Sequence, residues 1–151
     1  MGDGRLRWAA LLIGGLTATA AVAEPVVSPP TLNCARGFEG LRTSIQALEG
    51  AQWSIEDGAD VATFSLADKW RAHIAFTTPA HPAHPAVTMR TFRHQVTGVW
   101  TADSKGCGYG DPARFSDLMA AMKVRDTELT NASRAEAERA KAGQSPLAPL
   151  P

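Results

Sequence analysis

The spacing of apolar residues in this chain changes near residue 50. Before that point, apolar side chains recur every three or four positions, at Phe38, Leu41, Ile45 and Leu48. This spacing is typical of a helix with one apolar face, and Gly50 is placed to end it. We therefore expect a first helix over residues 36–49.

From residue 53 onward, apolar and polar positions alternate, which is the pattern of β-strands. Trp53 and Ile55 share one parity, and Asp57-Gly58 offers a turn before the next run. In that run Ala62, Phe64 and Leu66 share a parity, which continues through Trp70, Ala72, Ile74 and Phe76. This alternation predicts an antiparallel sheet with one buried face and one wetter face, with Trp70 in the core.

Residues 69–100 read as a β-hairpin whose tip, residues 77–86, contains Pro79, Pro82 and Pro85. All four histidines of the chain lie in the tip or on the two arms. On the returning arm the apolar side changes between Met89 and Phe92, so the strand is either bulged or covered on both faces. The faces of Arg90, Arg93 and His94 therefore stay open.

A second helix is predicted to begin at Asp111-Pro112, because a capping carboxylate followed by proline is a strong helix start. Its apolar stripe is Phe115, Leu118, Met119 and Met122. No large apolar residue occurs between Leu129 and Leu147, which predicts a polar, mobile tail over residues 130–151. The expected fold is thus an α+β domain over residues 33–129: helix, four- or five-stranded antiparallel meander, helix, with both helices on one face.

The N-terminus carries Arg5 and Arg7, then an apolar run ending in Ala21-Val22-Ala23. This pattern predicts a signal peptide over residues 1–23, followed by a proline-rich, extended lead-in over residues 24–32. The run is shorter than the roughly 20 apolar residues that span a bilayer, so we expect cleavage and no stable membrane anchor. The predicted destination is the periplasm or the exterior.

The chain has only two cysteines, Cys34 and Cys107. An exported chain meets an oxidising compartment, so the two are predicted to form one disulfide that joins the starts of the two helices. The chain has 15 basic and 15 acidic residues. Such a balance favours neither nucleic acid nor an anionic membrane as a partner.

Three function classes fit these patterns. The first is a non-enzymatic module that binds another exported protein, such as an inhibitor, an immunity-type protein or an assembly protein. The second is a copper- or zinc-binding protein that uses His81 and His84, with Met89 as a further ligand. The third is a small hydrolytic enzyme that pairs His73 or His94 with Asp60, Asp68 or Asp103.

The binding module is the preferred hypothesis, because a stiff hairpin tip, aromatic residues and arginines are typical of protein contacts. Its candidate binding residues are Arg71, His73, His81, His84, Arg90, Arg93 and His94. No serine elbow or HExxH motif occurs, so we assign no catalytic residue and no cofactor. The run Gly106–Gly110 is interpreted as a structural turn rather than a phosphate loop. The sequence names no partner and leaves the oligomeric state open.

Overall fold

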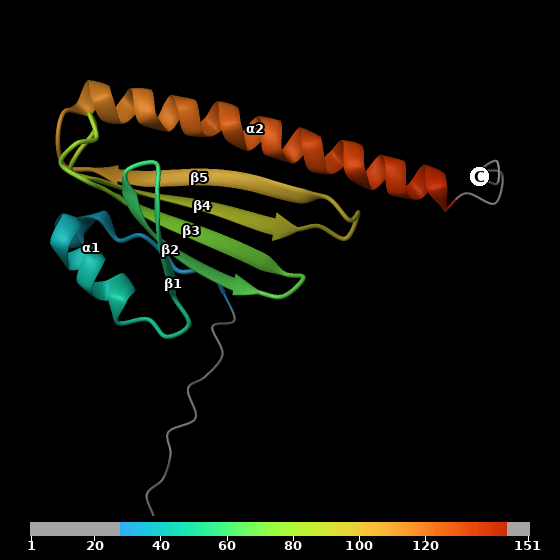
Figure 1. Cartoon of the computed structure of the whole chain (residues 1–151), viewed down its shortest axis with the longest axis horizontal. Helices are drawn as coiled ribbons and strands as arrows, with labels where there is room; N and C mark the ends of the chain where they lie inside the picture. The colour runs from blue at the N-terminus through green and yellow to red at the C-terminus, as the bar shows by residue number, and fades with distance from the viewer. Residues whose placement is uncertain (1–27, 145–151) are drawn as a thin grey trace, which may run out of the picture.

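The computed structural model describes residues 28–144. The predicted signal peptide, the first part of the lead-in and residues 145–151 lie outside the described residues. The described elements are η1 (Cys34–Arg36), α1 (Gly37–Gln46), β1 (Gln52–Glu56), β2 (Ala59–Leu66), β3 (Trp70–Thr77), β4 (Ala86–His94), β5 (Trp100–Gly108) and α2 (Pro112–Gly143). The five strands form one antiparallel sheet in the order in which they occur in the chain (Figure 1). The predicted fold class is therefore confirmed.

Local signals in the sequence account for several element boundaries. Asp57 and Gly58 adopt φ angles of 49° and 73°, which suit a tight hairpin turn between β1 and β2. Asp111 caps α2, because its side chain accepts a hydrogen bond from the backbone N–H of Arg114 at 2.9 Å. Pro112 occupies the first turn of α2, where its missing N–H costs nothing.

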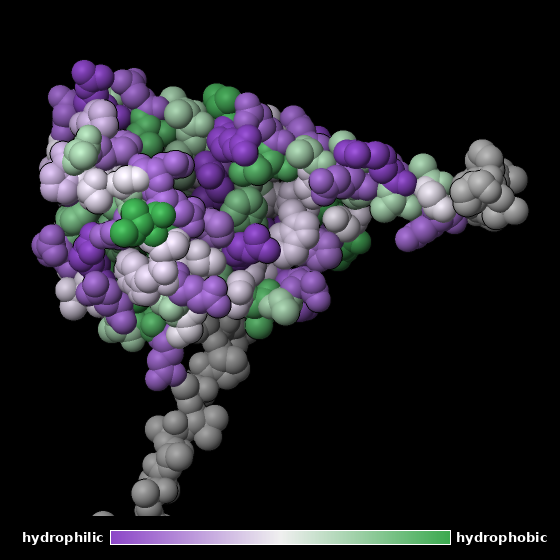
Figure 2. Space-filling view, in the orientation of Figure 1, coloured by the Kyte–Doolittle hydropathy of each residue, from purple (hydrophilic) through white to green (hydrophobic). Residues whose placement is uncertain are grey.

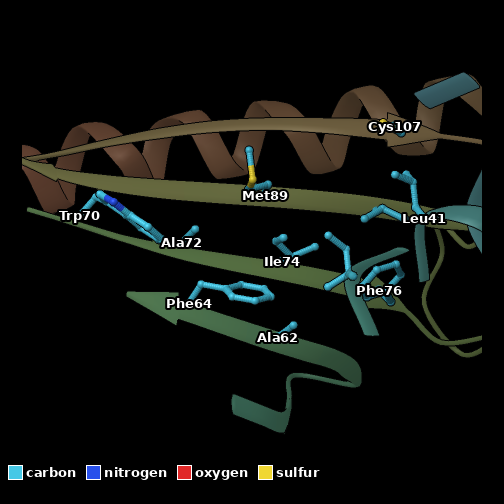
Figure 3. Packing of buried hydrophobic residues seen from close by; sticks show 11 residues of the cluster. Leu41, Ala62, Phe64, Trp70, Ala72, Ile74, Phe76, Met89 and Cys107 are labelled. Atoms are coloured by element: carbon cyan, nitrogen blue, oxygen red, sulfur yellow. The ribbon is translucent and has the colours of Figure 1, made fainter. Parts of the chain in front are cut away.

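The hydrophobic core lies between α1 and one face of the sheet. In register, Ala62 stands opposite Ile74, and Ile74 stands opposite Met89, so their side chains share this face. Leu41 of α1 covers it (Figure 3), and Ile45 of the same helix belongs to the same buried cluster. Trp70 is only 5% exposed in this cluster, as its parity predicts. We call this side of the sheet the α1 face.

The expectation that both helices cover one face is wrong. A side chain at Gly106 or Gly108 would meet the Phe115 ring of α2, whereas Cys107, between these glycines, belongs to the core cluster. Successive residues of a strand point to opposite faces. The helix α2 therefore packs on the opposite side of the sheet, which we call the α2 face, and the two glycines give its aromatic ring room.

Strand β4 is covered on both faces and contains no bulge, since its pairing with β5 continues without interruption from Ala86 to His94. Val87 and Met89 point to the α1 face. Arg90, Phe92 and His94 have the other parity and belong to the α2 face. The change of apolar side along this strand thus reflects two layers of cover.

The sequence predicts a tail from residue 130, whereas the structure continues α2 to Gly143. Two hydroxyl groups attach this part of the helix to β5. Thr130 Oγ1 accepts from the backbone N–H of Ala102 at 3.0 Å, and Ser133 Oγ accepts from that of Trp100 at 2.9 Å. Polar residues therefore hold this helix segment, which an apolar pattern could not reveal.

The last turns of α2 extend beyond the sheet (Figure 1) and form a narrow, largely hydrophilic projection (Figure 2). Within residues 28–144, no helix has both the length and the apolar character that crossing a membrane requires.

Candidate functional site

A groove runs along the α2 face between the sheet and α2. It contains a cavity of about 280 Å³ lined by Arg71, Phe92, Trp100, Leu129, Ala132, Ser133 and Glu136. Strands β3, β4 and β5 supply Arg71, Phe92 and Trp100. These residues are neighbours on the α2 face, because Arg71 pairs in register with Phe92, and Trp100 pairs with His94, the next residue of β4 on the same face. We call this feature the α2 groove.

The floor of the α2 groove is aromatic. The imidazole of His94 stacks on Trp100 with a centroid distance of 4.7 Å and an interplanar angle of 15°. His73 meets Phe92 edge to face at 5.4 Å. Both histidines thus lie beside the floor, and the two large rings are fixed in place for contact with a ligand.

One face of α2 forms the wall of the groove. Leu129, Ala132, Ser133 and Glu136 follow one another at spacings of three, one and three, and therefore share a helix face. The hydrogen bond from Trp100 N–H to Ser133 Oγ fixes this wall directly against the floor. The wall leaves no apolar stripe in the sequence, because two of its residues are alanine and serine, although the spacing itself is visible.

The two charged residues of the groove have opposite sign. Arg71 lies on β3 and Glu136 lies on α2, and both are exposed. Within residues 28–144, neither side chain forms an ion pair or a hydrogen bond. Both charges are therefore available to a ligand.

Arg90, another predicted binding residue, attaches α2 to the sheet and does not line the groove. Its Nε lies 2.6 Å from Asp126 Oδ1, and Asp126 is 6% exposed. Asp126 Oδ1 also accepts a hydrogen bond from Ser104 Oγ at 2.9 Å. This buried group attaches α2 to β4 and β5, one turn before Leu129 begins the groove wall.

The pKa of His73 lies below the ordinary histidine value of 6.5. Burial is the largest cause, since it disfavours the charged imidazolium; the positive charges of Arg71 and Arg90 act in the same direction, and Glu56 opposes them. The imidazole of His73 is therefore neutral at pH 7. It contributes an uncharged aromatic ring beside Phe92.

The carboxylates predicted as partners of His73 and His94 form no pair with either histidine. Asp60 pairs with Arg42 of α1 at 2.7 Å, and Asp103 has the parity of the α1 face. The Nδ1 atom of His94 lies 3.2 Å from the backbone oxygen of Asp68, not from its carboxylate. The structure does not bring together a histidine–carboxylate pair from these residues.

The tip of the β3–β4 hairpin lies at the other end of the sheet, beside α1. His84 packs edge to face on Phe38 at 5.3 Å, and its Nδ1 lies 2.8 Å from the backbone oxygen of Thr77. His81 Nδ1 accepts from the Ala83 N–H at 3.0 Å, and Ala83 is buried. The tip therefore folds back on the domain and does not project as a free loop.

Met89 does not join these histidines, because it is 1% exposed in the core. In the part of the chain that the structure describes, no group of three or more His, Cys, Asp or Glu side chains could hold a metal ion. Arg93 is also separate. It has the parity of the α1 face and lies with Pro29 and Pro30 around a small cavity of about 110 Å³.

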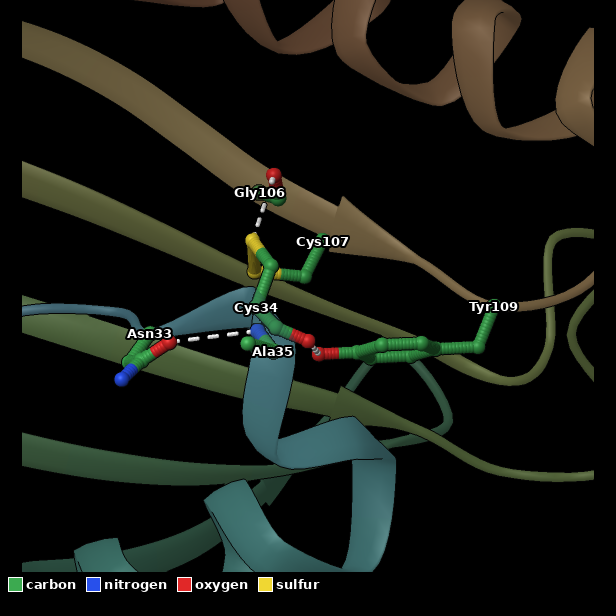
Figure 4. The surroundings of a disulfide bond; sticks show 6 residues. All are labelled: Asn33, Cys34, Ala35, Gly106, Cys107 and Tyr109. Atoms are coloured by element: carbon green, nitrogen blue, oxygen red, sulfur yellow. Dashed lines mark hydrogen bonds between the residues drawn. A yellow bond between two sulfur atoms is a disulfide. The ribbon is translucent and has the colours of Figure 1, made fainter.

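The predicted disulfide is present and connects η1 to β5 (Figure 4). Beside it, the Tyr109 hydroxyl donates a hydrogen bond to the backbone oxygen of Cys34 at 2.9 Å. Burial raises the pKa of Tyr109. Together with the packing of Phe115 on Gly106 and Gly108, these contacts give the glycine-rich run a structural role.

The structure therefore gathers Arg71, His73 and His94 of the predicted binding residues at one site. It assigns Arg90 to the attachment of α2, and it places His81, His84 and Arg93 elsewhere. Comparison of the chain with family models, with curated proteins and with solved structures finds no match, so the geometry of the groove carries the functional argument.

Proposed function

We propose that this chain is an exported, non-enzymatic module that binds a segment of another exported protein in the α2 groove. The observation that carries the proposal is the meeting of Arg71, Phe92 and Trp100 in one groove. Tryptophan and arginine dominate the energetics of protein–protein contacts. Here they come from different strands and are held by a helix that crosses over them.

The residues that line the groove indicate which kind of polypeptide segment it would bind. Phe92, Trp100 and Leu129 offer an apolar surface for one large apolar side chain. Arg71 would attract an acidic group, and Glu136 would attract a basic group. The expected ligand is thus a polypeptide segment with an apolar anchor between charges of opposite sign.

The size of the cavity supports a side chain as the occupant. Pockets for small-molecule ligands usually enclose roughly 300–1,000 Å³. The cavity here is about 280 Å³, which is smaller than that range. A single anchoring side chain of a longer segment fits such a space, with the rest of the segment lying along α2.

Export is part of the proposal. It rests on the pattern of Ala21-Val22-Ala23 after an apolar run and on the Cys34–Cys107 disulfide, since such bonds persist in oxidising compartments. Mass spectrometry of the chain from the exported fraction of a bacterial host should give a mature N-terminus at Glu24. Recovery of the uncleaved chain in the cytosol would contradict export.

Binding is tested by charge reversal in the groove. Proteins of the exported fraction that the wild-type chain retains are identified, purified and titrated against Arg71→Glu and Glu136→Lys. Each variant should weaken binding by about tenfold or more, because it reverses a contact charge. Both residues are exposed, so the melting temperature should stay unchanged.

The matched controls are Arg114→Glu and Glu39→Lys, which make the same changes at exposed sites outside the groove lining. They should leave affinity within about twofold, as expected for charges outside the contact. Equal losses in the groove variants and the controls would contradict the α2 groove as the binding site, as would unchanged affinity in all four.

A further inference from the structure

The two outer edges of the sheet differ in how they are covered. Along β5, Thr130 and Ser133 of α2 accept hydrogen bonds from two backbone N–H groups of the edge strand. Strand β1 forms the other edge (Figure 1), and within residues 28–144 no strand pairs with its outer side. All five residues of β1 are exposed.

The sequence of β1 also lacks the usual protection of an edge strand. Edge strands are commonly blunted by lysine, proline or a bulge, which stop them from pairing with another chain. Gln52–Glu56 contains neither lysine nor proline, its one charged residue, Glu56, stands at the end of the strand, and its pairing with β2 is regular. Two large apolar side chains are exposed instead, Trp53 at 42% and Ile55 at 81%.

We propose that β1 pairs with β1 of a second copy of this chain, antiparallel, about a two-fold axis through Ser54. A two-fold axis perpendicular to the sheet reverses the strand direction and keeps each face on its own side. Centring it on Ser54 pairs all five residues of β1. The two sheets then join into one continuous sheet.

The sequence of β1 is complementary to itself in this register. Trp53 of each copy stands opposite Ile55 of the other, and both have the parity of the α1 face, so their apolar side chains meet. Gln52 stands opposite Glu56 of the other copy, so no like charges face each other. The apolar match of Trp53 with Ile55, without like charges opposed elsewhere in the register, is what favours a second copy over an unrelated strand.

The dimer is independent of the α2 groove. The groove is formed by β3, β4, β5 and α2, whereas the dimer uses only β1 at the opposite edge. Both grooves stay accessible in the dimer, one toward each end of the joined sheet. The dimer can therefore be tested without knowing the ligand of the groove.

The test compares Ile55→Lys with Val96→Lys in the purified chain by sedimentation equilibrium. Ile55 and Val96 are both largely exposed, and Val96 lies between β4 and β5, away from β1. The wild-type chain should dimerise with rising concentration. Ile55→Lys should raise the dimer Kd about tenfold or more, because it removes the apolar contact with Trp53 and places a lysine on the edge strand. Val96→Lys should change the dimer Kd less than about twofold.

Hydrogen exchange gives the second measurement. Amide protons on the outer side of β1 should exchange more slowly as the concentration of the wild-type chain rises, because pairing occupies them. A wild-type chain that stays monomeric up to about 1 mM would overturn the proposal. So would a dimer that Ile55→Lys leaves intact, or one whose β1 amides exchange as fast as in the monomer.

Discussion

Arg90 of β4 forms an ion pair with the buried carboxylate of Asp126 of α2, in which Arg90 Nε lies 2.6 Å from Asp126 Oδ1. Arg90 Nη2 also donates a hydrogen bond to the backbone oxygen of Met122 at 3.4 Å. The pair sits one turn before Leu129, where the wall of the α2 groove begins. It therefore connects the stability of the domain to the position of that wall.

Replacing Asp126 by asparagine should destabilise the domain strongly. The change leaves the Arg90 guanidinium largely buried without a counter-charge, which typically costs about 3–5 kcal/mol in the free energy of unfolding. The control is Glu128→Gln, which breaks the exposed Arg125–Glu128 pair and should cost less than about 1 kcal/mol. Urea denaturation of both variants measures the difference. Similar losses in the free energy of unfolding would contradict a large contribution of the Arg90–Asp126 pair to stability.

Thr130→Val and Ser133→Ala should each destabilise the domain by about 1 kcal/mol, because each removes the acceptor of a backbone N–H of β5. Thr127→Val is the matched control, since within residues 28–144 its hydroxyl bonds only to the backbone oxygen of Lys123 in the same helix. Hydrogen exchange at Trp100 and Ala102 reports the same bonds directly. Their amides should exchange faster in the two variants, and unchanged rates would mean that α2 does not cover this edge in solution.

Removing the disulfide should lower the free energy of unfolding by about 4 kcal/mol in the chain-entropy model, because Cys34 and Cys107 are 73 residues apart. The variant Cys34→Ala, Cys107→Ala tests this by urea denaturation without a reductant. Thiol titration of the unfolded wild-type chain should find no free thiol. Two thiols per chain would show that the bond does not form.

The lowered pKa of His73 makes stability depend on pH. Its folded pKa lies below the unfolded value of 6.5, so between the two values the unfolded state binds more protons. The contribution of His73 to stability is therefore fully present above pH 6.5 and is lost as the pH falls toward the folded pKa. The wild-type chain should lose more stability between pH 8 and pH 5 than His73→Gln does.

His94→Gln is the control for this pH dependence, because it removes another histidine of the α2 face and leaves His73 in place. The His94→Gln variant should keep the difference in the free energy of unfolding between pH 8 and pH 5 that His73→Gln loses. Urea denaturation at both pH values measures all three chains. A wild-type chain and a His73→Gln variant with the same pH dependence would contradict the assignment to His73.

Much of the fold is determined locally, and those parts could be predicted from the sequence. The spacing of Leu41 and Ile45 specifies the face that α1 buries, and the parity of Trp70 specifies its place in the core. Asp111 and Pro112 specify the start of α2. These signals are legible because a helix repeats every 3.6 residues and a strand every two, so neighbouring residues alone reveal them.

Only the tertiary structure decided which face each helix covers and which residues form the α2 groove. Gly106 and Gly108 show their function only once Phe115 packs on them, and Thr130 and Ser133 stabilise α2 only once β5 lies beside them. Arg71 and Glu136 come together across 65 positions of the chain in the same way. Contacts of this kind depend on shape and on backbone hydrogen bonds between distant segments, and neither leaves a periodic pattern in the sequence.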